Sequence, residues 1–170
     1  MKKALFLSLS AMCMTVLSFA QTSPPATATG TINGANVTIK YSSPSVRGRQ
    51  IWGGLVPYDK VWRAGANSAT IIETDKDLWL EGQKLPAGKY SLYAIPGQNE
   101  WTMIFNSATG QWGINRDGST TEDPAKDVIR VKVKPGKSAA MQEALKYDIN
   151  GQGIWLNWEN LSVPVKVKVK

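Results

Sequence analysis

Apolar and polar residues alternate along most of the chain from residue 31 onward. A period of two is typical of a β-strand with one buried face and one face in water. The clearest runs, with an apolar residue at every second position, are 37–41, 78–80, 101–105, 129–133, 145–149, 154–158 and 163–169. Strands of this kind occur in antiparallel sheets that pack on one side only. The pattern therefore predicts a fold built from antiparallel sheets.

Turn signals separate these runs and set the number of strands. Pairs of Gly with Asn, Asp or Pro, which favour tight turns, occur at 96–99, 117–118, 135–136 and 150–151. Residues 138–145 are the one helix candidate, of a turn or two. We predict an all-β fold, an antiparallel β-sandwich of about eight or nine strands, with a barrel as the alternative. Residues 31–170 are expected to form a single β-sandwich domain, since the sequence has no internal repeat.

One long segment, residues 43–68, interrupts the alternation. It is rich in Gly and Pro, and it contains three arginines and two tryptophans. Compact domains rarely contain a long connection that has no role. We expect this Arg/Trp-rich loop either to be a lid or binding loop, or to pack across the end of the sandwich as structure.

Residues 1–20 are expected to be a secretory signal peptide. Lys2 and Lys3 give a positive start, residues 4–19 carry no charge, and small residues at Ser18 and Ala20 fit a cleavage site. The apolar run is short for a membrane span, which favours a cleaved signal peptide. A retained membrane anchor is the alternative. Residues 21–30, dominated by Pro, Ala and Thr, are expected to be a flexible leader. The mature protein is then exported to the periplasm, cell surface or medium, with no membrane span.

The composition excludes several kinds of chemistry. The chain has no histidine, and its single cysteine, Cys13, lies in the predicted signal peptide. Nucleophilic triads with His, zinc sites with His or Cys ligands, and disulfides are therefore excluded from the mature protein. We expect no cofactor and no metal. Loss of Lys2 and Lys3 lowers the net charge from +7 to +5, which suits an anionic partner or simply solubility.

Parts of the chain resemble a known family. The stretches IWGGLVPYDKVWRAGAN at 51–67, LPAGKYSLYAIPGQNEWTMIFN at 85–106 and QWG at 111–113 resemble a bacterial secreted family known as domain of unknown function 2911 (DUF2911). The resemblance covers about residues 31–169. Ala64 stands where the family usually has Thr, and Asp59 stands where it usually has Gly. The resemblance implies export and a β-rich fold, and it implies no activity and no catalytic residues.

Six side chains of the long segment are predicted to bind a ligand. Arginine offers a planar fork for carboxylate, sulfate or phosphate, and tryptophan offers a flat apolar platform. Asparagine can donate and accept hydrogen bonds. The candidate residues are Arg47, Arg49, Trp52, Trp62, Arg63 and Asn67, with Tyr58 beside them. In the structural alternative, the tryptophans cap the core and the arginines pair with Asp59, Glu73 or Asp75.

Two further groups have both a functional and a structural reading. Trp79 and Trp155 alternate in phase with polar neighbours, so we expect them on an outer sheet face, where sugars could stack on them. A register error of one residue would turn them inward. Four carboxylates lie close together in the sequence, at Glu73, Asp75, Asp77 and Glu81. Two carboxylates at the right separation could catalyse glycoside hydrolysis, and Asp75 and Asp77 could help to hold Ca²⁺. The turn between two strands also explains them.

Basic residues alternate along two of the predicted strands, at Arg130, Lys132, Lys134, Lys166, Lys168 and Lys170. They form one positive face if the two strands are neighbours. Lysines on edge strands also prevent aggregation, and nucleic acid is not an expected partner of an exported protein.

We therefore expect an exported, non-catalytic binding or accessory module, whose ligand is a glycan or another anionic or hydroxylated envelope molecule. The alternatives are a carboxylate-based enzyme of the glycosidase, lyase or isomerase type, and a structural envelope protein. The sequence leaves the oligomeric state open.

Overall fold

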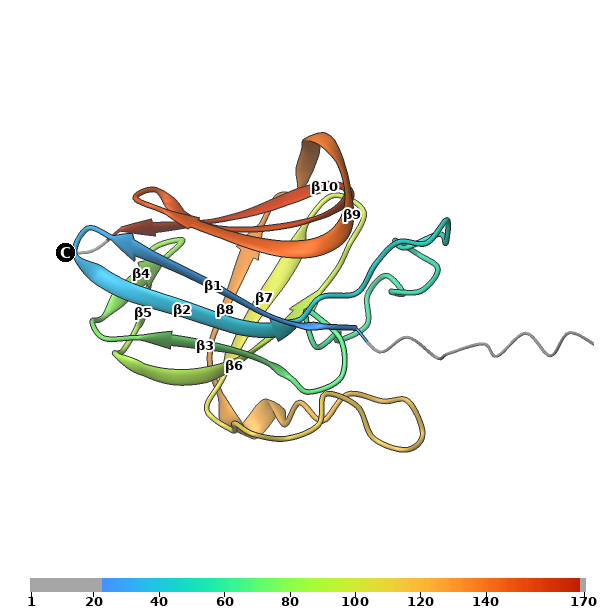
Figure 1. Cartoon of the computed structure of the whole chain (residues 1–170). Coiled ribbons are helices and arrows are strands. Elements are labelled where there is room, and N and C mark those ends of the chain that lie inside the picture. Colours follow the sequence, from blue (N-terminus) through green and yellow to red (C-terminus); the bar gives the residue numbers. More distant parts are fainter. Residues whose placement is uncertain (1–22, 169–170) are drawn as a thin grey trace, which may run out of the picture.

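Two antiparallel β-sheets pack against each other in the computed structural model, which describes residues 23–168 (Figure 1). The six-stranded sheet has the order β1-β2-β3-β6-β7-β8. Its strands are β1 (Pro25–Ile32), β2 (Ala35–Ser42), β3 (Thr70–Thr74), β6 (Gly88–Ile95), β7 (Trp101–Asn106) and β8 (Asp127–Val133). The four-stranded sheet, of order β5-β4-β10-β9, contains β5 (Gln83–Leu85), β4 (Leu78–Leu80), β10 (Gly153–Lys168) and β9 (Gly136–Asn150). The predicted all-β sandwich is confirmed.

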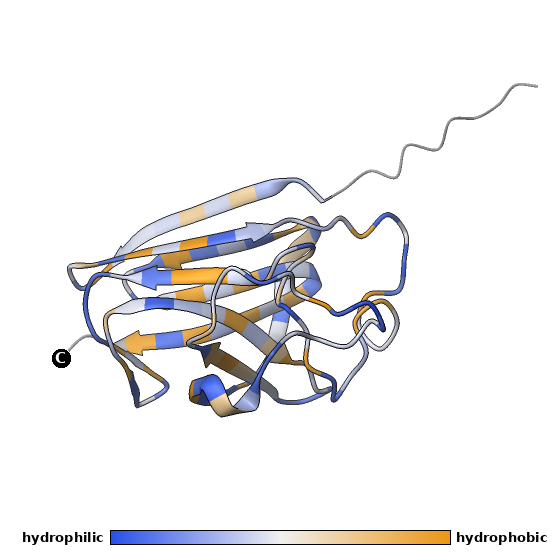
Figure 2. Cartoon of the chain, turned by 90° about the horizontal axis from the view of Figure 1, so that it is seen from below, coloured by the Kyte–Doolittle hydropathy of each residue, from blue (hydrophilic) through white to orange (hydrophobic). Residues whose placement is uncertain are grey.

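The core lies between the two sheets, and the alternation in the sequence builds it. Along β2, Val37 and Ile39 are buried while Lys40 is exposed. Leu145 and Leu156 contribute to the same core from β9 and β10. The strands show this alternation as orange and blue segments in Figure 2. The period of two thus has the cause inferred from the sequence, one buried face per strand.

The middle of the six-stranded sheet departs from simple alternation. All residues from Tyr90 to Ala94 on β6 are buried. Tyr93 and Ile104 belong to a second, smaller cluster, against which Val61 of the long segment packs. Loops therefore cover the outer face of β6 and β7, so these strands are buried on both sides.

The expectation of a flexible leader over residues 21–30 is wrong from residue 25 onward. Residues 25–32 form β1, which pairs with β2 from Pro25↔Ser42 to Ile32↔Ala35. A β-carbon at Gly30 would lie 2.7 Å from the Ile149 side chain, so β1 lies directly against β9. This close approach requires small residues, and small residues conceal the alternation that reveals the other strands. Residues 21–22 and the predicted signal peptide 1–20 lie outside the described residues.

The helix candidate 138–145 is also wrong, because these residues belong to β9. β9 and β10 form a long hairpin with register shifts around Glu159, whose φ is 54°. Val167 N donates to Gln152 O at 3.1 Å, so the end of β10 returns to its beginning. The register shifts around Glu159 form a β-bulge, and a bulge bends its strand. The bend lies beside Trp158, which contributes to the site described below.

In the part of the chain that the structure describes, the remaining regular element is a 3-10 turn, Pro124–Lys126. Between residues 23 and 168, no helix is long and apolar enough to cross a membrane.

Candidate functional site

The long Arg/Trp-rich segment covers one end of the sandwich and extends its core. Trp52 packs edge-on against Trp101 and Trp158, with ring centroids 4.9 Å and 5.6 Å apart. Trp62 stacks on Trp158 at 5.9 Å with an interplanar angle of 18°. Trp101 and Trp158 are 0% and 1% exposed, and Trp52 is 9% exposed. Four indoles from three parts of the chain therefore form one aromatic cluster, and they hold the segment on the sandwich.

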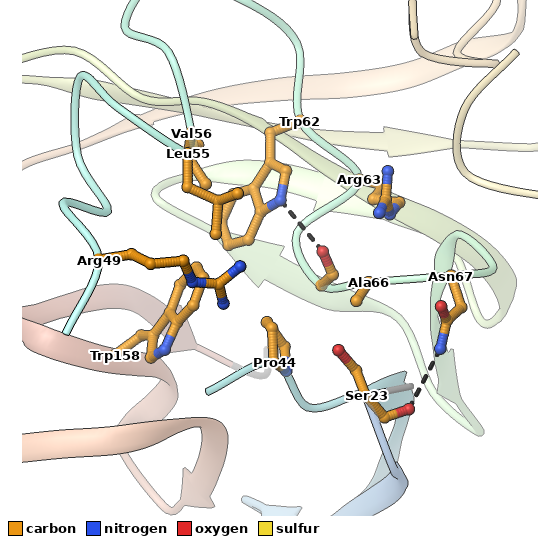
Figure 3. Close-up of a pocket in the computed structure, with 11 residues that line it drawn as sticks. Ser23, Pro44, Arg49, Leu55, Val56, Trp62, Arg63, Ala66, Asn67 and Trp158 are labelled. Carbon is orange, nitrogen blue, oxygen red and sulfur yellow. Dashed lines mark hydrogen bonds between the residues drawn. The ribbon is translucent and has the colours of Figure 1, made fainter. Parts of the chain in front are cut away.

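A pocket of about 300 Å³ opens beside this cluster (Figure 3). Four of the six predicted ligand residues line it: Arg49, Trp62, Arg63 and Asn67. The other two do not. Trp52 belongs to the core, and Arg47 is exposed, with its backbone N–H bonded to Glu143 Oε1 at 2.9 Å.

Arg49 enters the pocket in a fixed orientation. Its Nε donates to Val46 O at 3.1 Å, and its Nη2 donates to Ser45 O at 2.5 Å. Two main-chain carbonyls therefore hold the plane of the guanidinium. Nη1 makes no hydrogen bond to residues 23–168, so this edge is available to a ligand.

Arg63 is half-buried and has no charged partner among the described residues. Its side chain makes no ion pair or hydrogen bond there, and its Nε is buried without an acceptor. Burial lowers the pKa of the Arg63 guanidinium below its usual value. The alternative in which the arginines of this segment pair with Asp59, Glu73 or Asp75 is wrong for residues 23–168. Among residues 23–168, no Asp, Glu or Lys lines the pocket.

A tight turn at residues 64–67 positions the side chains of Trp62, Arg63 and Asn67. Ala64 and Asn67 have φ of 51° and 58°, and the Ala64 carbonyl accepts hydrogen bonds from Thr70 Oγ1 and Tyr147 Oη. Trp62 Nε1 donates to Gly65 O at 3.1 Å, which fixes the indole that walls the pocket (Figure 3).

The opposite side of the pocket is formed by the start of the described chain. Asn67 Nδ2 donates to Ser23 O at 3.1 Å, as drawn in Figure 3. The Asn67 Oδ1 acceptor remains free of partners within the described part of the chain, and it is oriented by this bond. The pocket thus combines guanidinium donors, an amide acceptor and an indole wall.

The family model described as "Protein of unknown function (DUF2911)" matches residues 23–167. The chain belongs to this family. The match confirms the resemblance seen in the sequence, and the description of DUF2911 assigns no activity. No curated protein and no solved structure matches the chain significantly.

Within the predicted acidic cluster of this DUF2911 chain, Asp75 and Asp77 lie in the turn between β3 and β4, whereas Glu73 belongs to β3. Asp75 accepts hydrogen bonds from Asn36 N at 2.8 Å and Asn36 Nδ2 at 2.6 Å, which lower the pKa of Asp75. Asp77 pairs with Lys84 Nζ at 2.7 Å and accepts from Ala87 N, which lowers its pKa as well. These carboxylates have partners of their own and do not line the pocket.

The outward tryptophans of the DUF2911 fold are only half-buried. Trp155 lies opposite Asp148, and Trp79 lies opposite Lys168. Neither lines the pocket, so the predicted site and the predicted stacking platforms are separate places.

The basic residues of β8 and those of β10 do not form one sheet face, because the two strands belong to different sheets. Lys170 lies outside the described residues. Lys132 pairs with Glu100 at 2.8 Å. Arg130 pairs with Asp127 and with Glu122, whose side chain is 5% exposed. Burial and the neighbouring Asp127 raise the pKa of Glu122.

Two of the residues that line the pocket lie outside the long segment in which sequence analysis placed the site. Trp158 sits in an alternating strand and looks like any core residue, and Ser23 lies in the supposed leader. No group of three potential metal ligands occurs in residues 23–168.

Proposed function

We propose that this DUF2911 protein is an exported, non-catalytic binding module. Its ligand is a glycan or another anionic or polyhydroxylated molecule of the cell envelope. The supporting observation is the pocket, where Arg49 and Arg63 meet an indole wall and where residues 23–168 contribute no carboxylate to the lining. Export is inferred from the charge and hydropathy pattern of residues 1–20.

The chemistry of the lining favours a ligand with acceptor oxygens. A partly desolvated guanidinium without a partner is costly, and an oxygen-bearing ligand would offset that cost. A volume of about 300 Å³ is at the small end for ligand sites, and it suits one or two sugar rings or a molecule of similar size. The indole of Trp62 adds an apolar wall of the kind on which sugar rings pack.

The pocket offers little to the enzyme alternative. A glycosidase without His or Cys needs paired carboxylates, and a lyase or isomerase needs a base. The described part of the chain contributes no Asp, Glu or Lys to the lining, and the carboxylates of Asp75 and Asp77 are bonded elsewhere.

The test is a binding screen of residues 21–170 against acidic and neutral envelope and dietary glycans. Tryptophan fluorescence is the readout, because Trp62 and Trp158 line the pocket. We expect a ligand whose binding is lost in Arg63→Gln and retained in Arg47→Gln. The second variant makes the same charge change in the same segment, outside the pocket. A folded protein that binds nothing in a broad panel would refute the proposal, and turnover of the bound ligand would refute its non-catalytic part.

A further inference from the structure

Gly113, in the β7–β8 connection, lies against the stem of Arg63. A β-carbon at position 113 would lie 2.1 Å from Arg63 Cδ and 2.8 Å from Arg63 Cβ. Gly113 is buried, and its φ is not among the positive values of the chain. The position therefore needs the absence of a side chain for space, and any other residue would displace Arg63.

The backbone at Gly113 is tied to the same turn that forms the pocket. Gly113 N donates to Asn67 O at 3.0 Å, and Trp112 forms a bridge with Ser68. Thr121 Oγ1 donates to the Trp112 carbonyl at 2.5 Å. The β7–β8 connection is thus a fixed support along which the Arg63 side chain lies.

The second arginine of the pocket, Arg49, lies across the pocket from Arg63. Figure 3 shows Arg49 and Arg63 on opposite sides of the pocket, with Trp62 above and Ser23 below. Carbonyl groups anchor Arg49, and Gly113 supports the stem of Arg63. Neither guanidinium has a carboxylate partner within residues 23–168. Each planar guanidinium can present two N–H groups to an oxyanion, and two of them line this one pocket.

We propose that Arg49 and Arg63 clamp one oxyanion group of the ligand, and that Gly113 is the positioning residue that directs Arg63 into the clamp. This rests on the proposed function and narrows it, because the recognised group is a carboxylate, phosphate or sulfate. Neutral parts of the ligand then contribute through the indole wall.

The test compares charged and neutral probes on residues 21–170. The probes are glucuronate for a carboxylate, inorganic phosphate and sulfate for tetrahedral anions, and glucose as the uncharged sugar, each measured by calorimetry and tryptophan fluorescence. Losing a charged hydrogen bond weakens binding by about tenfold to a hundredfold. We expect that loss for the bound anion in Arg63→Lys, which keeps the charge and loses the planar fork, and in Gly113→Ala.

Gly113 should act through Arg63, and a double-mutant cycle tests this. In the Arg63→Gln background, Gly113→Ala should change anion affinity no further. The control is Gly151→Ala, at an open turn where a β-carbon meets nothing within 4 Å. It should leave affinity unchanged. Anion binding should also weaken with salt, as expected for charged contacts.

The outcomes separate the clamp from the proposed function. Wild-type anion affinity in Gly113→Ala, or in Arg63→Lys if the glycine variant does not fold, overturns the clamp. Equal affinity for glucose and glucuronate also overturns it, while the binding module stands. If no probe and no glycan binds the folded protein, both proposals fail.

Discussion

Tyr147→Phe is expected to loosen the turn that carries Arg63. The Tyr147 ring is buried on β9, and its hydroxyl donates to the Ala64 carbonyl oxygen at 2.7 Å. Ala64 has a φ of 51°, in a region that residues other than glycine rarely adopt. The hydrogen bond therefore stabilises an unfavourable backbone conformation next to the pocket.

The expected magnitude follows from the number of donors at that oxygen. Thr70 Oγ1 donates to the same carbonyl at 3.0 Å, so Tyr147→Phe does not leave it unpaired. Loss of one such bond costs about 1 kcal/mol of unfolding free energy. In a domain of this size, that lowers the melting temperature by about 2–4 °C. Thr70→Val should cost a similar amount.

The double variant is the decisive measurement. With both donors removed, the buried Ala64 carbonyl has lost its side-chain partners, which adds a penalty of about 1–3 kcal/mol. Urea unfolding, followed by tryptophan fluorescence, should therefore show a loss larger than the sum of the two single losses. Additive losses, or a single loss near zero, would refute the reasoning that the two hydroxyls share one acceptor.

Three further predictions follow from described contacts. Because burial raises the pKa of Glu122, wild-type stability should fall as pH rises from the ordinary carboxylate range through that pKa, and Glu122→Gln should remove this fall in pH-dependent urea unfolding. The bond to Lys84 lowers the pKa of Asp77, so the contribution of Asp77 to the free energy of unfolding should vanish as pH falls through that pKa. The free energy of unfolding of Asp77→Asn should therefore fall less on acidification than that of the wild type. Gly30→Leu should lower the urea midpoint by forcing β1 off Ile149, at a cost of about 1–3 kcal/mol. The exposed control Thr29→Leu should not.

The sequence predicted the sheets well where burial is one-sided. The alternation at 37–41 and 145–149 corresponds to strands with one buried face. β1 was missed because PATATGTI alternates between small residues, which contribute little to a hydropathy pattern. Its place in the sheet depends on close packing against β9, which only the tertiary structure creates.

The candidate site was predicted in part. The enrichment of Arg and Trp in one long segment located it, and Arg49, Trp62, Arg63 and Asn67 line the pocket. Trp52 joined the aromatic core instead, because three other indoles offered it contacts that the sequence does not show. Whether an arginine pairs with a carboxylate depends on which loops meet in the folded chain. The absence of an ion-pair partner for Arg63 among residues 23–168 could therefore not be predicted.

The location of Ser23 in the pocket lining affects the choice of terminus for a fused tag or label. Ser23 lines the pocket, and β1 begins at this end of the sandwich, whereas β10 ends at the other (Figure 1). A purification tag fused just before Ser23 would therefore start at the pocket mouth and could compete with the ligand. A tag after β10 would not. The same geometry turns the N-terminal side into an attachment point for a fluorescent reporter that senses when the pocket is filled.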